Sequence, residues 1–240
     1  MIIEGRNSVR EAVRSLTQLD KIYIQNDIKG RENQELVDEI KLGEYDYQFV
    51  GKSFLDRMSE EGRHQGFIAK TRDFNYCDVE EIIDRANAQG EQLFMVILDG
   101  IKDPHNFGNI IRTCECAGVH GIMIEKHSAC GVTETVMRVS AGAVNHMPIA
   151  RVTNINREIE KLKDRGVWVY ACELGGGLVY NTNLRGDLAI VIGSEGEGVS
   201  KLTKQTCDGV FTLPMKGKVN SLNASNATAI ALYEALRQRM

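Results

Sequence analysis

The chain has 240 residues, of which 42% are hydrophobic and 26% charged, with a formal net charge of −4 and a pI near 5.8. These values are typical of a globular protein with a substantial core, and no apolar run approaches the roughly 18 residues that a membrane-spanning helix needs. They also exclude a uniformly basic nucleic-acid binder, so any polyanion has to be bound by local clusters of positive charge.

Residues 1–72 alternate between helical and strand patterns. Helices are predicted at 6–15, 32–43 and 52–60, and strands at 20–25, 45–50 and 65–71. A segment of this length can form a small α/β domain by itself.

An acidic segment follows at 73–92, with one basic and six acidic side chains. Its central part, "DVEEIIDRANAQ", has a helical pattern. We therefore predict a linker that contains a helix.

Residues 93–240 contain apolar runs without alternation, which are typical of strands buried on both faces of a parallel sheet. The runs are "LFMVIL", "GIMIE", "MPIARV", "VWVYAC", "LAIVIG" and "VFTLPM". Helical patterns lie between several of them, at 107–118, 155–166 and 198–207. This alternation predicts an α/β domain with a mostly parallel sheet, in which ligands bind at the carboxyl ends of the strands.

The first of these strand ends is followed by "IKDPHNFGNIIRTCECAG". Pro104 and Gly108 break the chain, and a helix is expected to begin near Asn106. Asn106 is then either an N-cap or a functional residue. Arg112 lies off the apolar stripe of this helix and is either a surface charge or a functional residue.

A glycine-rich segment, "SEGEGVS", follows "LAIVIG". Its glycines allow tight turning or close approach of a ligand to the backbone. The spacing is neither G-x-G-x-x-G nor a P-loop, and Glu195 and Glu197 would repel phosphate. The segment therefore favours a neutral or cationic ligand. A dehydrogenase-like dinucleotide binder needs G-x-G-x-x-G after the first strand, where this sequence has "DGIKDPHNFG", so that alternative is rejected.

The last strand leads into "KGKVNSLNASNATAIALYEAL", which places two serines and three asparagines between Asn220 and Asn226. Capping a helix needs one or two such residues. Uncharged side chains and backbone groups can recognise an adenine, and a glutamate can lie near a cation. Together the three strand ends are consistent with S-adenosylmethionine, an adenosine that carries a sulfonium cation.

The six cysteines are scattered, with no C-x-x-C pair and no histidines at zinc-ligand spacing. We expect reduced thiols, no metal site and a cytoplasmic protein, since the first residues do not resemble a signal peptide.

Three motifs resemble those of a known family. "NFGNIIRTCECAG" resembles the first motif, N-x-G-x-x-x-R, of the SpoU (TrmH-like) branch of the SPOUT RNA methyltransferases. "VIGSEGEGVS" and "LPMKGKVNSLNASNATAIALYEALRQ" are similar to the second and third motifs. "EGRNSVREAV" and "HQGFIA" resemble the N-terminal module of bacterial enzymes that methylate the guanosine 2′-oxygen of 23S ribosomal RNA.

This resemblance implies a C-terminal deep trefoil knot over 93–240, an N-terminal module at 1–72 that is similar to ribosomal protein L30e, and a homodimer formed through the C-terminal domain. It implies that S-adenosylmethionine is held by Gly193, Leu213 and Leu222. The reaction site it implies consists of Asn106, Arg112, Glu195, Ser221 and Asn223. Asn220, Ser225 and Asn226 are then expected to act as caps.

The implied reaction is in-line transfer of a methyl group from sulfonium to a ribose 2′-oxygen. A guanidinium stays protonated, so Arg112 is expected to bind a phosphate and stabilise the developing alkoxide, while Glu195 orients Arg112 or the ribose. RNA contacts in the N-terminal module are predicted at Arg6, Arg10, Arg63, His64 and Gln65. The alternatives are the same reaction on transfer RNA, or a non-catalytic RNA-binding protein, which would be expected to lack Arg112, Glu195 or Asn223.

Overall fold

The computed structural model describes residues 2–14, 19–59, 62–71, 74–218 and 221–240. The chain divides into two compact units, Met1–Asn75 (unit 1) and Tyr76–Met240 (unit 2).

Unit 1 is a small α/β domain, as predicted. Its sheet has the order β1-β4-β2-β3, in which β2 and β3 are parallel and the other pairs antiparallel. The strands are β1 (Ile2–Glu4), β2 (Leu19–Gln25), β3 (Tyr47–Val50) and β4 (Phe67–Thr71). The helices are α1 (Arg6–Arg14), α2 (Arg31–Leu42) and α3 (Lys52–Met58). Strand β1 was not predicted, because a three-residue strand leaves no readable periodicity.

Unit 2 contains a sheet of six strands in the order β10-β8-β9-β5-β6-β7, and every neighbouring pair is parallel. The strands are β5 (Phe94–Asp99), β6 (Gly121–Glu125), β7 (Ile149–Val152), β8 (Trp168–Leu178), β9 (Leu188–Gly193) and β10 (Gly209–Thr212). The predicted parallel sheet is confirmed, and the central strands β5 and β9 are almost entirely buried.

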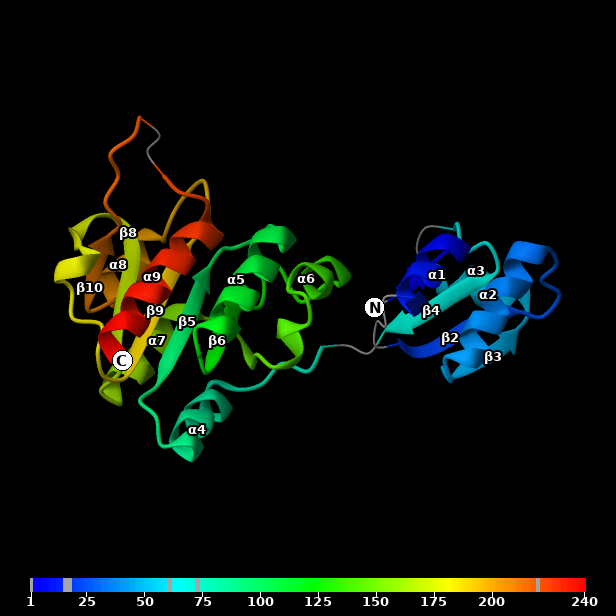
Figure 1. The fold of residues 1–240 in the computed structure, drawn as a ribbon, viewed down its shortest axis with the longest axis horizontal. Coiled ribbons are helices and arrows are strands. Elements are labelled where there is room, and N and C mark those ends of the chain that lie inside the picture. Colours follow the sequence, from blue (N-terminus) through cyan, green and yellow to red (C-terminus); the bar gives the residue numbers. More distant parts are fainter. Residues whose placement is uncertain (1, 15–18, 60–61, 72–73, 219–220) are drawn as a thin grey trace. The chain divides into compact units, whose positions relative to one another are not determined.

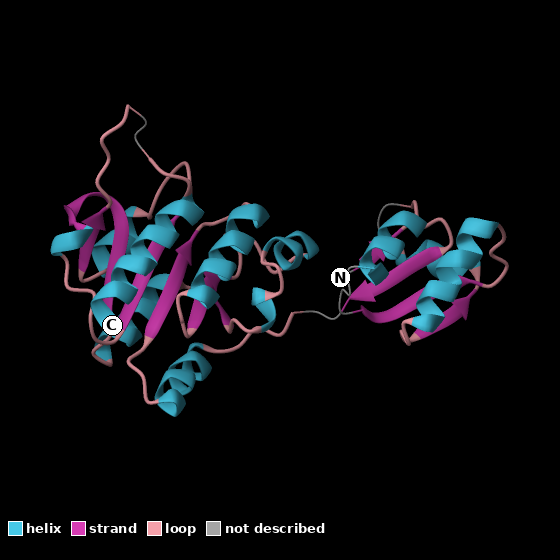
Figure 2. Cartoon of the chain, in the orientation of Figure 1, coloured by secondary structure: helices cyan, strands magenta, loops and turns pink. Residues whose placement is uncertain are grey.

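Helices cover both faces of this sheet (Figure 2). They are α4 (Val79–Gln89), α5 (Pro104–Cys116), α6 (Glu134–Val139), α7 (Ile155–Asp164), α8 (Lys201–Thr206) and α9 (Ala224–Arg239), with short 3-10 turns at Ala143–Asn145 and Val179–Asn181. One face packs against α4 and α7 through Ile82, Ile155 and Ile159. Helices α5 and α9 lie side by side over the other face (Figure 1).

The helix predicted within 73–92 is α4, and it packs into the core of unit 2. Ile82 and Ala86 are buried in the core of unit 2, and a Cβ atom on Gly121 would come within 2.5 Å of the Ile82 side chain. The backbone N–H of Cys77 also donates to the carbonyl of Ile149 at 3.0 Å. The acidic residues of α4 lie on its exposed side. The apolar residues on its other side are sufficient to attach the helix to the sheet.

None of the six cysteines forms a disulfide. Burial raises the pKa of Cys172 and of Cys207 to about 12, so both remain protonated thiols near neutral pH. In the described parts of the chain, no helix is long and apolar enough to cross a bilayer.

Candidate active site

The loops that follow β5 and β9 are joined at the carboxyl edge of the unit 2 sheet. Asp99 is the last residue of β5, and its carboxylate accepts a hydrogen bond from the N–H of Ser200 at 2.9 Å. Ser200 lies just beyond the glycine-rich segment that begins at Gly193, the last residue of β9. The parallel sheet therefore brings together two of the three strand ends identified in the sequence.

Asn223 is hydrogen-bonded to two other predicted site residues. Its side-chain Nδ2 donates to Oδ1 of Asn106 at 2.9 Å and to Oε1 of Glu195 at 2.5 Å. Asn106 belongs to α5, Glu195 to the glycine-rich segment, and Asn223 directly precedes α9. The fold thus joins residues that are 117 positions apart in the sequence.

The other end of the same amide caps helix α9. Oδ1 of Asn223 accepts hydrogen bonds from the N–H and the hydroxyl of Ser225 at 2.9 and 2.6 Å, and from the N–H of Asn226 at 3.4 Å. Ser225 and Asn226 were predicted to be caps, but they are the residues that Asn223 caps. Asn220 lies outside the described residues. Because the Nδ2 of Asn223 donates hydrogen bonds and its Oδ1 accepts them, the orientation of the amide is fixed.

Asn106 is not an N-cap. Helix α5 begins at Pro104, and the Asp103 carboxylate accepts hydrogen bonds from the N–H groups of His105 and Asn106 at 3.3 and 3.0 Å. Proline is favoured at the first helical position because its missing N–H needs no partner there. Asn106 is only 5% exposed, which leaves its side chain for the contact with Asn223.

Arg112 and Ser221 are exposed, and neither side chain has a partner among the residues that the structure describes. Arg112 lies six positions after Asn106 on α5. Because an α-helix turns by about 100° per residue, the two side chains point about 120° apart around the helix axis. Arg112 is therefore not part of the network formed by Asn106, Glu195 and Asn223. Its guanidinium is available to a bound molecule.

The glycine-rich segment folds back on itself. The N–H of Ser194 donates to the carbonyl of Gly198 at 3.2 Å, and the N–H of Gly198 donates to the carbonyl of Ser194 at 2.9 Å. A Cβ atom on Gly193 would lie 2.0 Å from the carbonyl carbon of Gly198, so only glycine fits. Of the two functions predicted for these glycines, the structure shows the tight turn.

The predicted cofactor residues lie around this turn. Leu213 directly follows β10 and is buried, whereas Leu222 precedes Asn223 and is 37% exposed. In the described part of the chain, the N–H groups of 195–197 have no hydrogen-bond partner and no cation pairs with Glu195 or Glu197. Uncharged donors beside carboxylates that lack a cationic partner fit an adenosine that carries a positive charge.

Within residues 2–14, 19–59, 62–71, 74–218 and 221–240, no group of three or more His, Cys, Asp or Glu side chains is placed to hold a metal ion.

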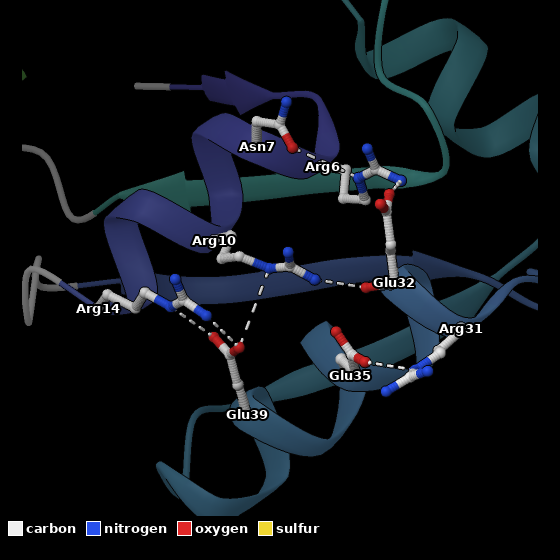
Figure 3. Close-up of polar contacts among 8 residues, drawn as sticks. All are labelled: Arg6, Asn7, Arg10, Arg14, Arg31, Glu32, Glu35 and Glu39. Atoms are coloured by element: carbon white, nitrogen blue, oxygen red, sulfur yellow. Dashed lines mark hydrogen bonds and ion pairs between the residues drawn. The ribbon is translucent and has the colours of Figure 1, made fainter.

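The predicted RNA contacts on α1 have partners on α2 (Figure 3). Arg6 forms an ion pair with the Glu32 carboxylate. Arg10 donates to the Glu32 carbonyl at 2.5 Å and lies 3.9 Å from the Glu39 carboxylate. Its side chain is only 19% exposed, so Arg10 holds α1 to α2 instead of facing a ligand. The Arg6 ion pair lies at the surface and is therefore weak enough for a phosphate to compete.

His64 is also committed to the protein. It is 6% exposed, its Nδ1 accepts from the N–H of Gly66 at 3.0 Å, and its Nε2 lies 3.0 Å from Oδ1 of Asp56. The first contact assigns the proton to Nε2, which donates to Asp56. The structure thus places His64, predicted to contact RNA, inside the turn that its ring shapes. Arg63 and Gln65 are exposed, and Oε1 of Gln65 accepts from the N–H of Arg6 at 3.3 Å.

Two family models match the chain, one in each unit. Residues 93–233 match the SpoU rRNA Methylase family, and residues 2–77 match the RNA 2′-O ribose methyltransferase substrate binding domain. YacO of Bacillus subtilis, named as a TrmH family tRNA/rRNA methyltransferase, is 41% identical over 98% of this chain and 94% of its own. A TrmH family relative of Staphylococcus aureus is also 41% identical, over 99% of this chain and 96% of its own.

Solved structures have the same fold. The SpoU methyltransferase AviRb from Streptomyces viridochromogenes, in complex with AdoMet, aligns with a TM-score of 0.65 and 24% identity over 99% of this chain and 90% of its own. The AdoMet-bound rRNA methyltransferase from Sinorhizobium meliloti aligns with a TM-score of 0.64 and 22% identity over 100% of this chain and 87% of its own. With both units matched and all three motifs at one sheet edge, the chain belongs to the SpoU rRNA methylase family.

Proposed function

We propose that this RNA methyltransferase uses S-adenosylmethionine to methylate the ribose 2′-hydroxyl of a guanosine in 23S ribosomal RNA. The observation that carries the proposal is the Asn106–Glu195–Asn223 network, which joins all three family motifs at the carboxyl edge of the sheet. The expected trefoil knot is part of the same proposal and rests on the family resemblance.

Unit 1 favours ribosomal RNA over transfer RNA. The structure solved for 2′-OH methylation of C/U34 on tRNA aligns over 61% of this chain, which is close to the share of unit 2 alone. The Sinorhizobium rRNA methyltransferase aligns over 100% of it. We infer that Arg6, Arg63 and Gln65 of unit 1 contact the RNA. Arg63 and Gln65 are exposed and Arg6 is partly exposed near the start of α1, so their guanidinium and amide groups can reach phosphates and unpaired bases.

In the reaction site, bound S-adenosylmethionine supplies a methyl group that its sulfonium makes electrophilic. Backbone groups at Gly193, Leu213 and Leu222 would hold the cofactor. Arg112 binds the phosphate beside the target ribose and stabilises the negative charge that develops on the 2′-oxygen. A phosphate oxygen or a water accepts the hydroxyl proton, because a guanidinium cannot.

The three remaining residues position the substrate. Glu195 was expected to orient Arg112 or the ribose. Its hydrogen bond from Asn223 supports a different role, in which Glu195 orients the Asn223 amide. Asn106 holds the same amide from the other side. The hydroxyl of Ser221, two residues before Asn223, is free among the described residues to contact the ribose.

The substrate is tested by incubating the protein with tritiated S-adenosylmethionine, excess EDTA and either a 23S ribosomal RNA fragment or transfer RNA. We expect label in the ribosomal RNA, at a ribose 2′-oxygen that loses its methyl group in cells lacking the gene. Label in transfer RNA alone would show that the alternative substrate is correct. Loss of activity in EDTA that returns with added metal would contradict the metal-free site.

We also propose a homodimer formed through unit 2. Ile230 and Tyr233 of α9 lie three residues apart, hence on one side of the helix, and are 42% and 52% exposed. Light scattering on residues 76–240 should give twice the monomer mass at micromolar concentration. A glutamate at Tyr233 should shift the protein toward monomer, and a wild-type monomer would contradict the proposal.

A further inference from the structure

Strand β8 contains a bulge beside the proposed cofactor loops. Its pairing with β10 moves from Ala171 opposite Val210 to Gly177 opposite Phe211, so residues 172–176 form a protrusion from the β10 ladder, although Cys172 keeps its pairing with Ile192 of β9. The protrusion stays close to β10, because a Cβ atom on Gly176 would lie 2.2 Å from the carbonyl oxygen of Val210. Glycine is therefore required there, and the bulge has a defined shape.

The Glu173 side chain reaches from this bulge to the glycine-rich segment. Its Oε2 accepts from the N–H of Val199 at 2.8 Å, and its Oε1 accepts from the N–H of Leu174 at 2.9 Å. Gly198 has a φ of +65°, and a Cβ atom there would lie 2.0 Å from Oε2 of Glu173. The carboxylate thus lies directly against the end of the turn that carries Glu195.

Thr212 fixes the backbone of the bulge. Its hydroxyl donates to the carbonyl of Glu173 at 2.7 Å and accepts from the N–H of Gly176 at 2.9 Å. Thr212 is the last residue of β10 and directly precedes Leu213. Glu173 is therefore connected to two of the segments proposed to hold the cofactor.

We propose that Glu173 is a positioning residue for methyl transfer. It holds the Val199 end of the turn, the Ser194–Gly198 pairing transmits that position to Glu195, and Glu195 sets the Asn223 amide. The inference rests on the proposed cofactor site. A carboxylate is needed because both of its oxygens accept backbone hydrogen bonds, whereas a glutamine would turn an NH2 group toward one of the two N–H donors.

The test compares full-length wild-type protein with Glu173→Gln and with Glu160→Gln. Glu160 is an exposed carboxylate on α7 with no partner among the described residues, so its substitution makes the same chemical change without touching the turn. Calorimetry gives S-adenosylmethionine affinity, tritium transfer gives kcat and KM, and amide hydrogen exchange reports the peptide that covers 194–200.

We expect Glu173→Gln to weaken cofactor binding about tenfold, in line with the loss of a hydrogen bond to a charged acceptor. Turnover should also fall, and exchange should rise in 194–200 but not in α7. Glu160→Gln should behave as wild type. Normal affinity and turnover in a folded Glu173→Gln protein would overturn the inference, even with faster exchange.

Thr212→Val provides a second route if Glu173→Gln does not fold. It removes both hydrogen bonds of the hydroxyl while keeping the side-chain shape, and it should weaken cofactor binding in the same direction. Unchanged binding in this variant would overturn the inference. Wild-type protein that fails to bind S-adenosylmethionine would instead reject the proposed site, and with it the role of Glu173.

Discussion

Replacement of Arg112 by alanine is expected to slow methyl transfer by about 10²–10³-fold, or about 3–4 kcal/mol, while leaving S-adenosylmethionine affinity nearly unchanged. The side chain is exposed on α5, apart from the Asn106–Glu195–Asn223 network, and has no ion pair among the described residues. A guanidinium gains nothing beside a sulfonium cation, so its partner has to be the RNA. The loss should therefore appear in turnover and RNA binding, not in cofactor binding.

Two further variants sharpen this prediction. Arg112→Lys keeps the positive charge but loses the planar fork, so it should recover only part of the activity. Arg157→Ala removes an exposed arginine of α7, which lies on the other face of the sheet, and should leave the rate unchanged. On the same preparations, tritium transfer measures the rate of methyl transfer and calorimetry measures the affinity for S-adenosylmethionine. Loss of cofactor binding as severe as the loss of activity would show that the proposed role of Arg112 is wrong.

Asn223→Asp is expected to reduce turnover by roughly two orders of magnitude without unfolding α9. Aspartate is as good an N-cap as asparagine, so the hydrogen bonds from Ser225 and Asn226 remain. The variant loses both donated hydrogen bonds and places a second carboxylate where Nδ2 lies 2.5 Å from Glu195. Each lost bond of this kind is worth about 1–3 kcal/mol, and the like charges add repulsion.

The double variant Asn223→Asp/Glu195→Gln is the matched control, because the new glutamine can donate to the new aspartate. It should recover part of the lost turnover. The defect of Asn223→Asp alone should become smaller as the pH falls, since two adjacent carboxylates can share a proton. Circular dichroism and melting curves should match wild type for both variants. A single variant with normal turnover would exclude a role for the amide donors.

Elements with a clear pattern could be predicted from the sequence. The uninterrupted apolar runs predicted all six strands of unit 2 and a mostly parallel sheet, because strands buried on both faces need no polar side. The three motifs predicted that Asn106, Glu195 and Asn223 belong to one site, and the structure joins them by hydrogen bonds.

What could not be predicted depends on tertiary contacts. Glu173 gave no signal, because its position follows from a shift in strand register between β8 and β10. His64 was predicted to contact RNA, but the sequence did not indicate that burial and a hydrogen bond from the N–H of Gly66 hold its ring within the turn. The oxygen of the Asn223 amide caps α9, and its nitrogen donates to Asn106 and Glu195. Both functions depend on α5, α9 and the glycine-rich segment meeting at this residue.

The long sequence separation within the Asn223 network has a consequence for biosynthesis. Asn106 precedes its partner by 117 residues, and Asn223 lies directly before the final helix. Contacts of this range close large loops, so they form late and slowly. A nascent chain still attached to the ribosome can fold unit 1 and much of the sheet, since domains form in the order of their synthesis. It cannot assemble the reaction site until Asn223 and α9 have left the ribosome and α9 can dock, so Asn106 waits for a partner that is made 117 residues later.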